Sequence, residues 1–184
     1  LLYVIIKNNK WKEALLIVCM VGLVILLADR ISSGFFKPFF HRFRPTHDPE
    51  IMGLVDVVNG YRSGKYGFLS GHAANSFGVI TFVSLLIRRK GFTFALIIWA
   101  ALNCYSRIYL GVHFPGDILC GTVLGCLIGV LVYYLYRFLN KKIFSREYSH
   151  VIAHQNNKHT ISDVKPILTV LYLSYFFIIV KALF

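Results

Sequence analysis

Long uncharged apolar stretches recur along this 184-residue chain and restrict what it can fold into. Five of them stand out, at residues 14–28, 73–87, 91–106, 118–136 and 167–180. Most are shorter than the roughly 20 residues that span a bilayer, and one such run alone would also fit a soluble core helix. Five runs joined by short basic turns exceed what one small soluble core can bury, whereas helices in lipid need no covering. We therefore predict an all-α, multi-pass transmembrane helical bundle, with about five helices here and six or more in the full protein.

Composition and charge support lipid as the solvent. Hydrophobic residues make up 57% of the chain and charged residues 15%, against roughly 45–50% and 25% in soluble domains. The formal net charge of +12 would suggest nucleic acid in a soluble protein. Here the basic residues of segments 7–12, 88–90 and 137–165 flank apolar runs, as the positive-inside rule describes. We expect no nucleic-acid partner, and we place segments 29–72 and 107–117 together on the outer face.

One composition runs through the chain, so we predict a single domain over 1–184. Its catalytic core is expected at about 29–136, followed by a cytoplasmic connector at 137–165 and an additional apolar helix at 166–184. The first residue is Leu1 rather than Met, and residues 1–6 resemble the end of an apolar segment. We therefore expect the N-terminus to be truncated. The four cysteines lie inside apolar runs and form no C-x-x-C pair, so we expect no metal there.

The first polar cluster of the outer face contains Lys37 and Arg44. It belongs to a long Gly- and Pro-rich segment, 31–69, in which we expect a short amphipathic helix near 35–43. Two cations seven residues apart, about two helical turns, point the same way if the chain between them is helical. Together they would clamp a phosphoryl group. The further cations of this face, Arg42, Arg62 and Lys65, are solvated surface residues or contacts to a second phosphate or head group.

Two more clusters carry histidines. Ser70, Gly71 and His72 precede an apolar run, where Ser70 suits a helix N-cap and Gly71 allows a ligand close to the free backbone N–H groups. The alternative to an anion site is that Ser70 is only a helix cap and that His72 is an interfacial residue. In the third cluster, around Arg107, Pro115 suits the first turn of a helix, so that His113 precedes this helix and Asp117 lies in its first turn. The carboxylate would fix the imidazole tautomer and leave the other nitrogen free to attack phosphorus.

These clusters resemble, in order and spacing, the signature K-x6-R-P, P-S-G-H and S-R-x5-H-x3-D of the type-2 phosphatidic acid phosphatase family, which includes bacterial acid phosphatases and vanadium haloperoxidases. The matching residues are Lys37, Arg44, Pro45, Ser70, Gly71, His72, Ser106, Arg107, His113 and Asp117. One position departs from the signature, because Leu69 stands where the family usually has proline. We expect that proline to shape the loop rather than to take part in the chemistry.

The resemblance implies a role for each matching residue. His113 would form a phosphohistidine, with Asp117 orienting it, and His72 would protonate the leaving oxygen and later activate water. Lys37, Arg44, Arg107 and the Ser70-Gly71 backbone would bind the phosphate oxygens. The same resemblance implies no cofactor and no metal ion.

A site between helix ends at a bilayer surface suits a lipid substrate that keeps its tail in the membrane. The expected function is therefore hydrolysis of a lipid phosphate or diphosphate at the outer, periplasmic face of a bacterial inner membrane. Undecaprenyl diphosphate is favoured, with phosphatidic acid, phosphatidylglycerol phosphate and lipid A phosphate as other candidates. Rival interpretations are a vanadate-dependent haloperoxidase, which the membrane helices disfavour, and a catalytically silent lipid-phosphate binding or transport protein. A silent relative would be expected to lack some of the matching residues, and all are present here.

Overall fold

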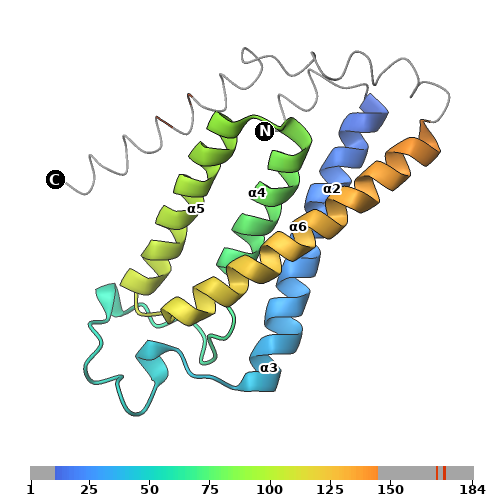
Figure 1. Cartoon of the computed structure of the whole chain (residues 1–184). Helices are drawn as coiled ribbons and strands as arrows, with labels where there is room; N and C mark the ends of the chain where they lie inside the picture. Colours follow the sequence, from blue (N-terminus) through green and yellow to red (C-terminus); the bar gives the residue numbers. More distant parts are fainter. Residues whose placement is uncertain (1–10, 145–168, 170–171, 173–184) are drawn as a thin grey trace.

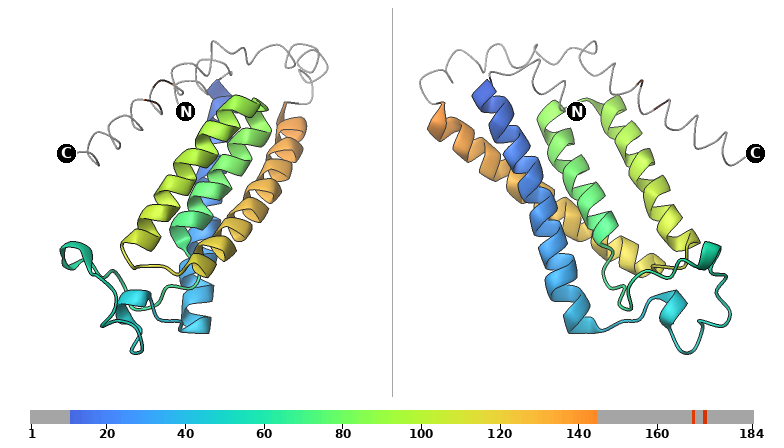
Figure 2. Two further views of the ribbon diagram at one scale, coloured as in Figure 1. Left: turned by 60° about the vertical axis from the view of Figure 1, so that its left-hand side comes forward. Right: turned by 180° about the vertical axis from the view of Figure 1, so that it is seen from behind.

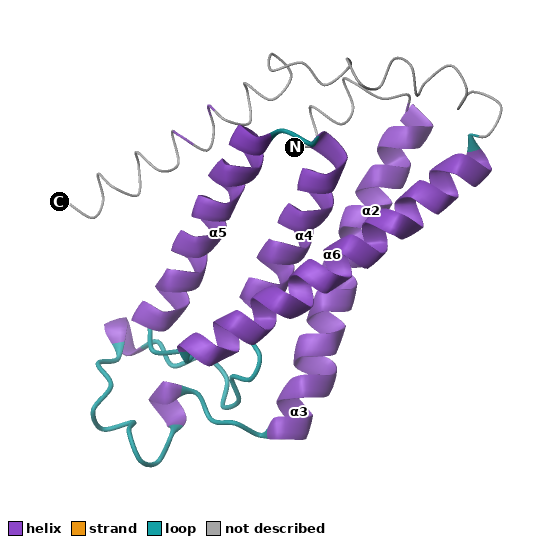
Figure 3. Cartoon of the chain, in the orientation of Figure 1, coloured by secondary structure: helices purple, strands orange, loops and turns teal. Residues whose placement is uncertain are grey.

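The computed structural model describes residues 11–144, 169 and 172, and in this part of the chain the fold is a bundle of helices (Figure 1). The first helix, α2, runs over Trp11–Asp29 and continues without a break through a π-helical segment, Arg30–Phe36, into the short α3, Lys37–Phe40. The later helices are α4 at Gly71–Ile87, α5 at Lys90–Tyr109 and α6 at Pro115–Ile143. Figure 3 shows the same chain with helices and loops distinguished. The prediction of an all-α membrane bundle is confirmed.

Three stretches of this bundle are long and apolar enough to cross a bilayer: 11–40, 90–109 and 115–143. The fourth apolar helix, α4, has 17 residues and is shorter than the roughly 20 that a span needs. It packs against α2, α5 and α6, so it occupies the middle of the bundle. The predicted helix at 166–184 and the basic segment 7–10 lie outside the described residues, apart from 169 and 172.

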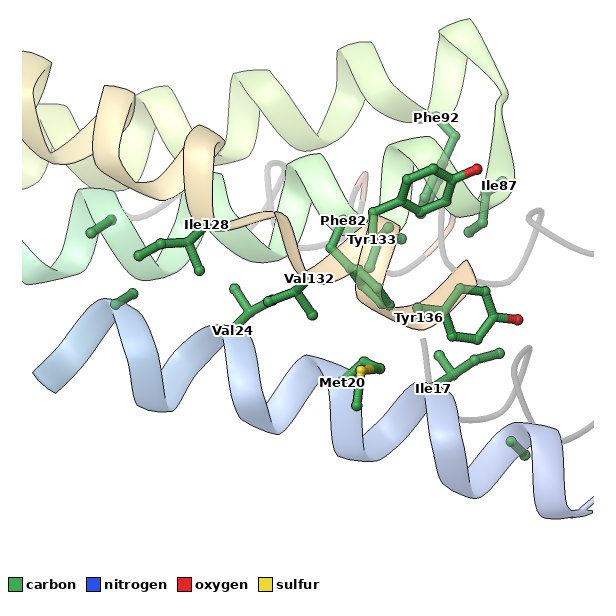
Figure 4. Close-up of a cluster of buried hydrophobic side chains, with 14 of the residues drawn as sticks. Ile17, Met20, Val24, Phe82, Ile87, Phe92, Ile128, Val132, Tyr133 and Tyr136 are labelled. Atoms are coloured by element: carbon green, nitrogen blue, oxygen red, sulfur yellow. The ribbon is translucent and has the colours of Figure 1, made fainter. Parts of the chain in front are cut away.

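The contact between α4 and α6 is the most extensive in the bundle, and it depends on glycine. A Cβ atom on Gly121 would lie 2.5 Å from the Ser70 carbonyl oxygen, and one on Gly129 would lie 2.5 Å from the Gly78 carbonyl oxygen. Small residues at such positions let two helix backbones approach closely, as is common in membranes. Closer to the far end of the bundle, aliphatic and aromatic side chains of α2, α4, α5 and α6 fill the core, including Ile17, Val24, Phe82, Phe92, Val132 and Tyr136 (Figure 4).

The polar segments predicted to lie together gather at one end of the bundle, which we call the loop end. There the connection 41–70 lies beside the end of α5 and the starts of α4 and α6 (Figure 2). This connection contains two short 3-10 turns, Pro45–His47 and Val58–Gly60, and a single antiparallel bridge between Phe43 and Tyr66. Leu69, the departure from the signature, is 2% exposed and belongs to the hydrophobic core.

Two helix boundaries differ from the prediction. The helix expected near 35–43 ends at Phe40, because His41 adopts a left-handed conformation with φ of 48°. At the other end of the bundle, α6 continues to Ile143, so residues 137–143 are helical although they were assigned to a connector. These residues mix basic and apolar side chains, and the apolar pattern alone therefore stops before the helix does.

Candidate active site

A polar cavity of about 220 Å³ opens at the loop end of the bundle. Six of the eight predicted site residues line it: Lys37, Arg44, Gly71, His72, Arg107 and His113. They come from α3, the 41–70 connection, α4, the end of α5 and the segment before α6. The remaining two, Ser70 and Asp117, are fully buried directly behind the cavity wall. Residues distant in sequence thus converge on one small space.

Arg44 is the most enclosed cation of the cavity, at 8% exposure. Its Nε donates a hydrogen bond to the Tyr66 carbonyl oxygen, and one terminal nitrogen donates to the Val112 carbonyl oxygen, both at 3.1 Å. The same terminal nitrogen lies 3.5 Å from Nε2 of His113. The helical link expected between Lys37 and Arg44 is wrong, because the chain reverses at His41. The two cations share the cavity through this reversal.

Lys37 is held by its own helix. Its Nζ donates a hydrogen bond to Oγ of Ser33 at 3.1 Å, and the Ser33 hydroxyl donates to the Asp29 carboxylate at 3.5 Å. The residues are spaced four apart along the π-helical segment and its borders, and all three line the cavity. The sequence interpretation missed Ser33 and Asp29, although their spacing from Lys37 is a signal of one helical face.

The Ser70-Gly71-His72 cluster begins α4 as predicted. The Ser70 side chain accepts a hydrogen bond from the Ala73 backbone at 3.4 Å, which makes Ser70 the N-cap. The Ser70 N–H donates to the Asp117 carbonyl oxygen at 3.0 Å, so the starts of α4 and α6 are joined directly. His72, one residue into the helix, is exposed and faces the cavity.

His113 and Asp117 form the buried side of the cavity. His113 is 2% exposed and Asp117 is fully buried, and Nδ1 of the imidazole lies 3.6 Å from Oδ2 of the carboxylate. The two atoms lie just beyond hydrogen-bond distance, and within the described residues Nδ1 has no hydrogen-bond partner. Burial lowers the pKa of His113 below its ordinary value, the neighbouring Asp117 opposes this change, and the Arg44 charge adds to it. A neutral imidazole with Nε2 towards the cavity can act as a nucleophile.

Arg42 has a partner that the sequence did not indicate. Its terminal nitrogen lies 2.9 Å from Oδ1 of Asp117, and its guanidinium stacks 4.5 Å from the centre of the Phe114 ring. Arg62 donates to the Thr46 carbonyl oxygen at 2.9 Å, and Lys65 lies over the ring of Phe43. None of the three lines the cavity, so the alternative of a contact with a second phosphate has no support here.

Arg107 completes the cationic lining. It is half-buried at the end of α5, and within the described part of the chain its Nε has no hydrogen-bond partner although it is shielded from solvent. A buried donor without a partner is costly, so this group suits an anionic ligand in the cavity. Tyr61, Ser63, Asn75 and Ser76 also line the cavity and were not singled out from the sequence.

A second cavity, of about 360 Å³ and mostly apolar, adjoins the first. It lies between α2, α4 and α5, and it shares Asn75 and Ser76 with the polar cavity. Its other walls are hydrophobic: Ile25, Val79, Ile80, Val83, Phe92, Leu96 and Trp99. A polar and an apolar space thus meet at one turn of α4.

Comparison with known proteins gives consistent matches. Residues 13–141 match the model of the PAP2 superfamily. The chain is 45% identical over 141 residues to a lipid A 4'-phosphatase of Porphyromonas gingivalis, and the match covers 77% of this chain and 60% of the relative. It is 41% identical over 147 residues to a lipid A 4'-phosphatase of Bacteroides thetaiotaomicron, and that match covers 79% of this chain and 65% of the relative. It therefore spans about three fifths of these relatives. A solved transmembrane PAP2-type phosphatidylglycerolphosphate phosphatase from Bacillus subtilis is 27% identical, with a TM-score of 0.48, covering 76% of this chain and 64% of that one.

Proposed function

Because this chain belongs to the PAP2 superfamily, we propose that it hydrolyses a phosphate monoester on a membrane lipid by way of a phosphohistidine, without a metal ion. The observation that carries the proposal is the junction of two cavities at Asn75 and Ser76. The cationic cavity suits a phosphate group, and the apolar cavity beside it suits hydrocarbon. A lipid phosphate has both parts joined in one molecule.

In the first step, Nε2 of His113 attacks phosphorus, and the bond between phosphorus and the lipid oxygen breaks. His72 supplies the proton that the departing oxygen needs. The proton on Nδ1 stays directed at Asp117, which stabilises the positive charge that develops on the ring. Lys37, Arg44 and Arg107 offset the negative charge on the phosphoryl oxygens. The products are a free lipid hydroxyl and phosphorylated His113.

In the second step, water attacks phosphorus and the nitrogen–phosphorus bond breaks. His72, which is now neutral, accepts a proton from this water. Inorganic phosphate leaves, and both histidines return to their starting states. The exposure of His72 suits this exchange, because the same residue must meet first a lipid oxygen and then a water molecule.

We propose a lipid A phosphate as the substrate and the periplasmic face of a bacterial inner membrane as the location of the site. The names of both relatives support lipid A over undecaprenyl diphosphate, which the sequence alone favoured. The periplasmic location is supported by the basic residues at the end of the bundle opposite the loop end, Arg88, Arg89, Lys90, Arg137, Lys141 and Lys142.

The test is phosphate release in detergent with EDTA from lipid A, phosphatidylglycerol phosphate, phosphatidic acid and undecaprenyl diphosphate. The wild type is compared with His113→Ala and with His47→Ala, a histidine of the 41–70 connection that does not line the cavity. We expect release to be fastest from lipid A, lost in His113→Ala and retained in His47→Ala. Release that requires Mg²⁺, or that survives in His113→Ala, would contradict the mechanism. No release from any lipid would favour the silent lipid-binding alternative.

A further inference from the structure

We propose that Arg42 is a positioning residue for the His113–Asp117 pair, holding one carboxylate oxygen so that the other is presented to the imidazole. The inference rests on the proposed function for its role in turnover. Arg42 lies between Lys37 and Arg44, at one of the unspecified positions of the K-x6-R-P pattern. The pattern therefore assigns it no role, and its contacts in the fold supply one.

The two oxygens of the Asp117 carboxylate contact different neighbours. Oδ1 accepts from Arg42 at 2.9 Å, whereas Oδ2 accepts from the Phe114 backbone at 2.9 Å and lies 3.6 Å from Nδ1 of His113. Bonds to both oxygens fix the rotation of the carboxylate plane. Without Arg42, Oδ1 would be a fully buried anionic oxygen without its partner, and the carboxylate would no longer be held with Oδ2 towards His113.

Arg42 is itself held in place from two sides. Its guanidinium stacks on Phe114, which precedes α6, and its backbone carbonyl accepts from the Gly67 N–H at 2.9 Å. The side chain is 44% exposed, so the charge pairs with Asp117 from the rim of the fold rather than from its interior. Because Arg42 does not line the polar cavity, its effect on a bound phosphate is indirect.

The consequence for His113 is electrostatic. The groups that face it are Lys37 on α3, Arg44 on the connection, His72 on α4 and Asp117 on α6, with Arg107 and Asp29 lining the same cavity. Asp117 is the group that favours the protonated imidazole. The positive charge of Arg42 partly neutralises this carboxylate. Without Arg42, the full negative charge of Asp117 would act on His113. The imidazole would then stay protonated to higher pH and would be a nucleophile over a narrower pH range.

Three variants test the proposal: Arg42→Gln, Arg42→Lys and the matched control Arg62→Gln. The control removes a positive charge from the same 41–70 connection, but Arg62 bonds to the Thr46 carbonyl oxygen and not to Asp117. We expect Arg42→Gln to lower kcat about 10- to 100-fold, as loss of a partner behind a functional group does. KM for lipid A should change little, and the acid limb of the kcat profile should move to higher pH. Arg42→Lys should restore most of the rate, and Arg62→Gln should match the wild type.

Titration of His113 by NMR, in protein labelled at histidine, gives a readout that needs no turnover. We expect the pKa of His113 to be higher in Arg42→Gln than in the wild type or Arg62→Gln. An unchanged titration would overturn the proposal, as would a rise in KM with an unmoved acid limb, which would make Arg42 a substrate contact. Failure of the wild type to release phosphate would refute the proposed function alone, because the titration would still report on Arg42.

Discussion

The two histidines of the cavity differ in how the protein holds them. His113 is almost fully buried, between Arg44 and an aspartate that is itself bonded at both oxygens. His72 is exposed one residue into α4. The buried side of the site is therefore organised before any ligand arrives, whereas the exposed His72 side chain is less constrained by its neighbours. This division suits a mechanism in which the nucleophile must be fixed and the proton carrier must serve two different oxygens in turn.

If the buried side is organised in advance, Asp117→Ala should have the largest effect on both activity and stability. We expect kcat to fall about 10⁴-fold, as for loss of the carboxylate in other histidine-centred sites. The melting temperature should fall as well, because Arg42 and the Phe114 N–H lose their acceptor. Phosphate release and thermal unfolding in detergent measure the two effects. A normal melting temperature would show that the buried side is less constrained than its contacts indicate.

On the exposed side, His72→Ala should affect catalysis alone. Loss of a general acid and base costs typically about 10²–10⁴-fold in kcat, and we expect that range here. The melting temperature should stay at the wild-type value, because the side chain is exposed. A leaving group of low pKa should recover part of the rate, since it needs no proton. A large drop in melting temperature would contradict the distinction between the two sides.

Gly121→Ala tests the contact between α4 and α6, which joins the exposed side of the site to its buried side. A Cβ atom there would lie 2.5 Å from the Ser70 carbonyl oxygen, so the start of α4 must move away from α6. We expect a loss of about 1–3 kcal/mol in stability, typical of overpacking, with a moderate fall in kcat. Gly22→Ala on α2 is the matched control, because a Cβ atom there meets nothing within 4 Å. Equal behaviour of the two variants would argue against the close helix contact.

The smallest effect concerns pH. Burial and Arg44 lower the pKa of His113, and the nucleophile must be neutral. His72 must be protonated in the first step, and burial lowers its pKa as well. The acid limb of the kcat profile, where His113 becomes protonated, should therefore lie below the ordinary imidazole pKa of about 6.5. A profile of kcat against pH in a constant-ionic-strength buffer measures this. An acid limb above 6.5 would mean that Asp117 outweighs burial.

Much of this arrangement was predictable from local pattern. The apolar runs predicted the four long helices α2, α4, α5 and α6, and Pro115 and Ser70 marked the starts of α6 and α4 correctly. The three clusters, matched to the family signature, likewise included six residues that line the cavity. What failed depends on distant contacts: Arg42 and Asp117 are 75 positions apart, and no periodicity relates them. The reversal at His41 was also hidden, because a left-handed residue in that position has no strong compositional signal.

The hydrogen bond from the Ser70 N–H to the Asp117 carbonyl oxygen limits the ways in which a ligand can enter the cavity. With glycines bringing the helix backbones together just behind it, this bond keeps the starts of α4 and α6 from separating like a hinge. A bulky head group would then be admitted more readily by displacement of the α2–α3 limb, whose Asp29, Ser33 and Lys37 line the cavity. Movement of that limb leaves the contacts that Arg44 and Arg42 make with His113 and Asp117 in place.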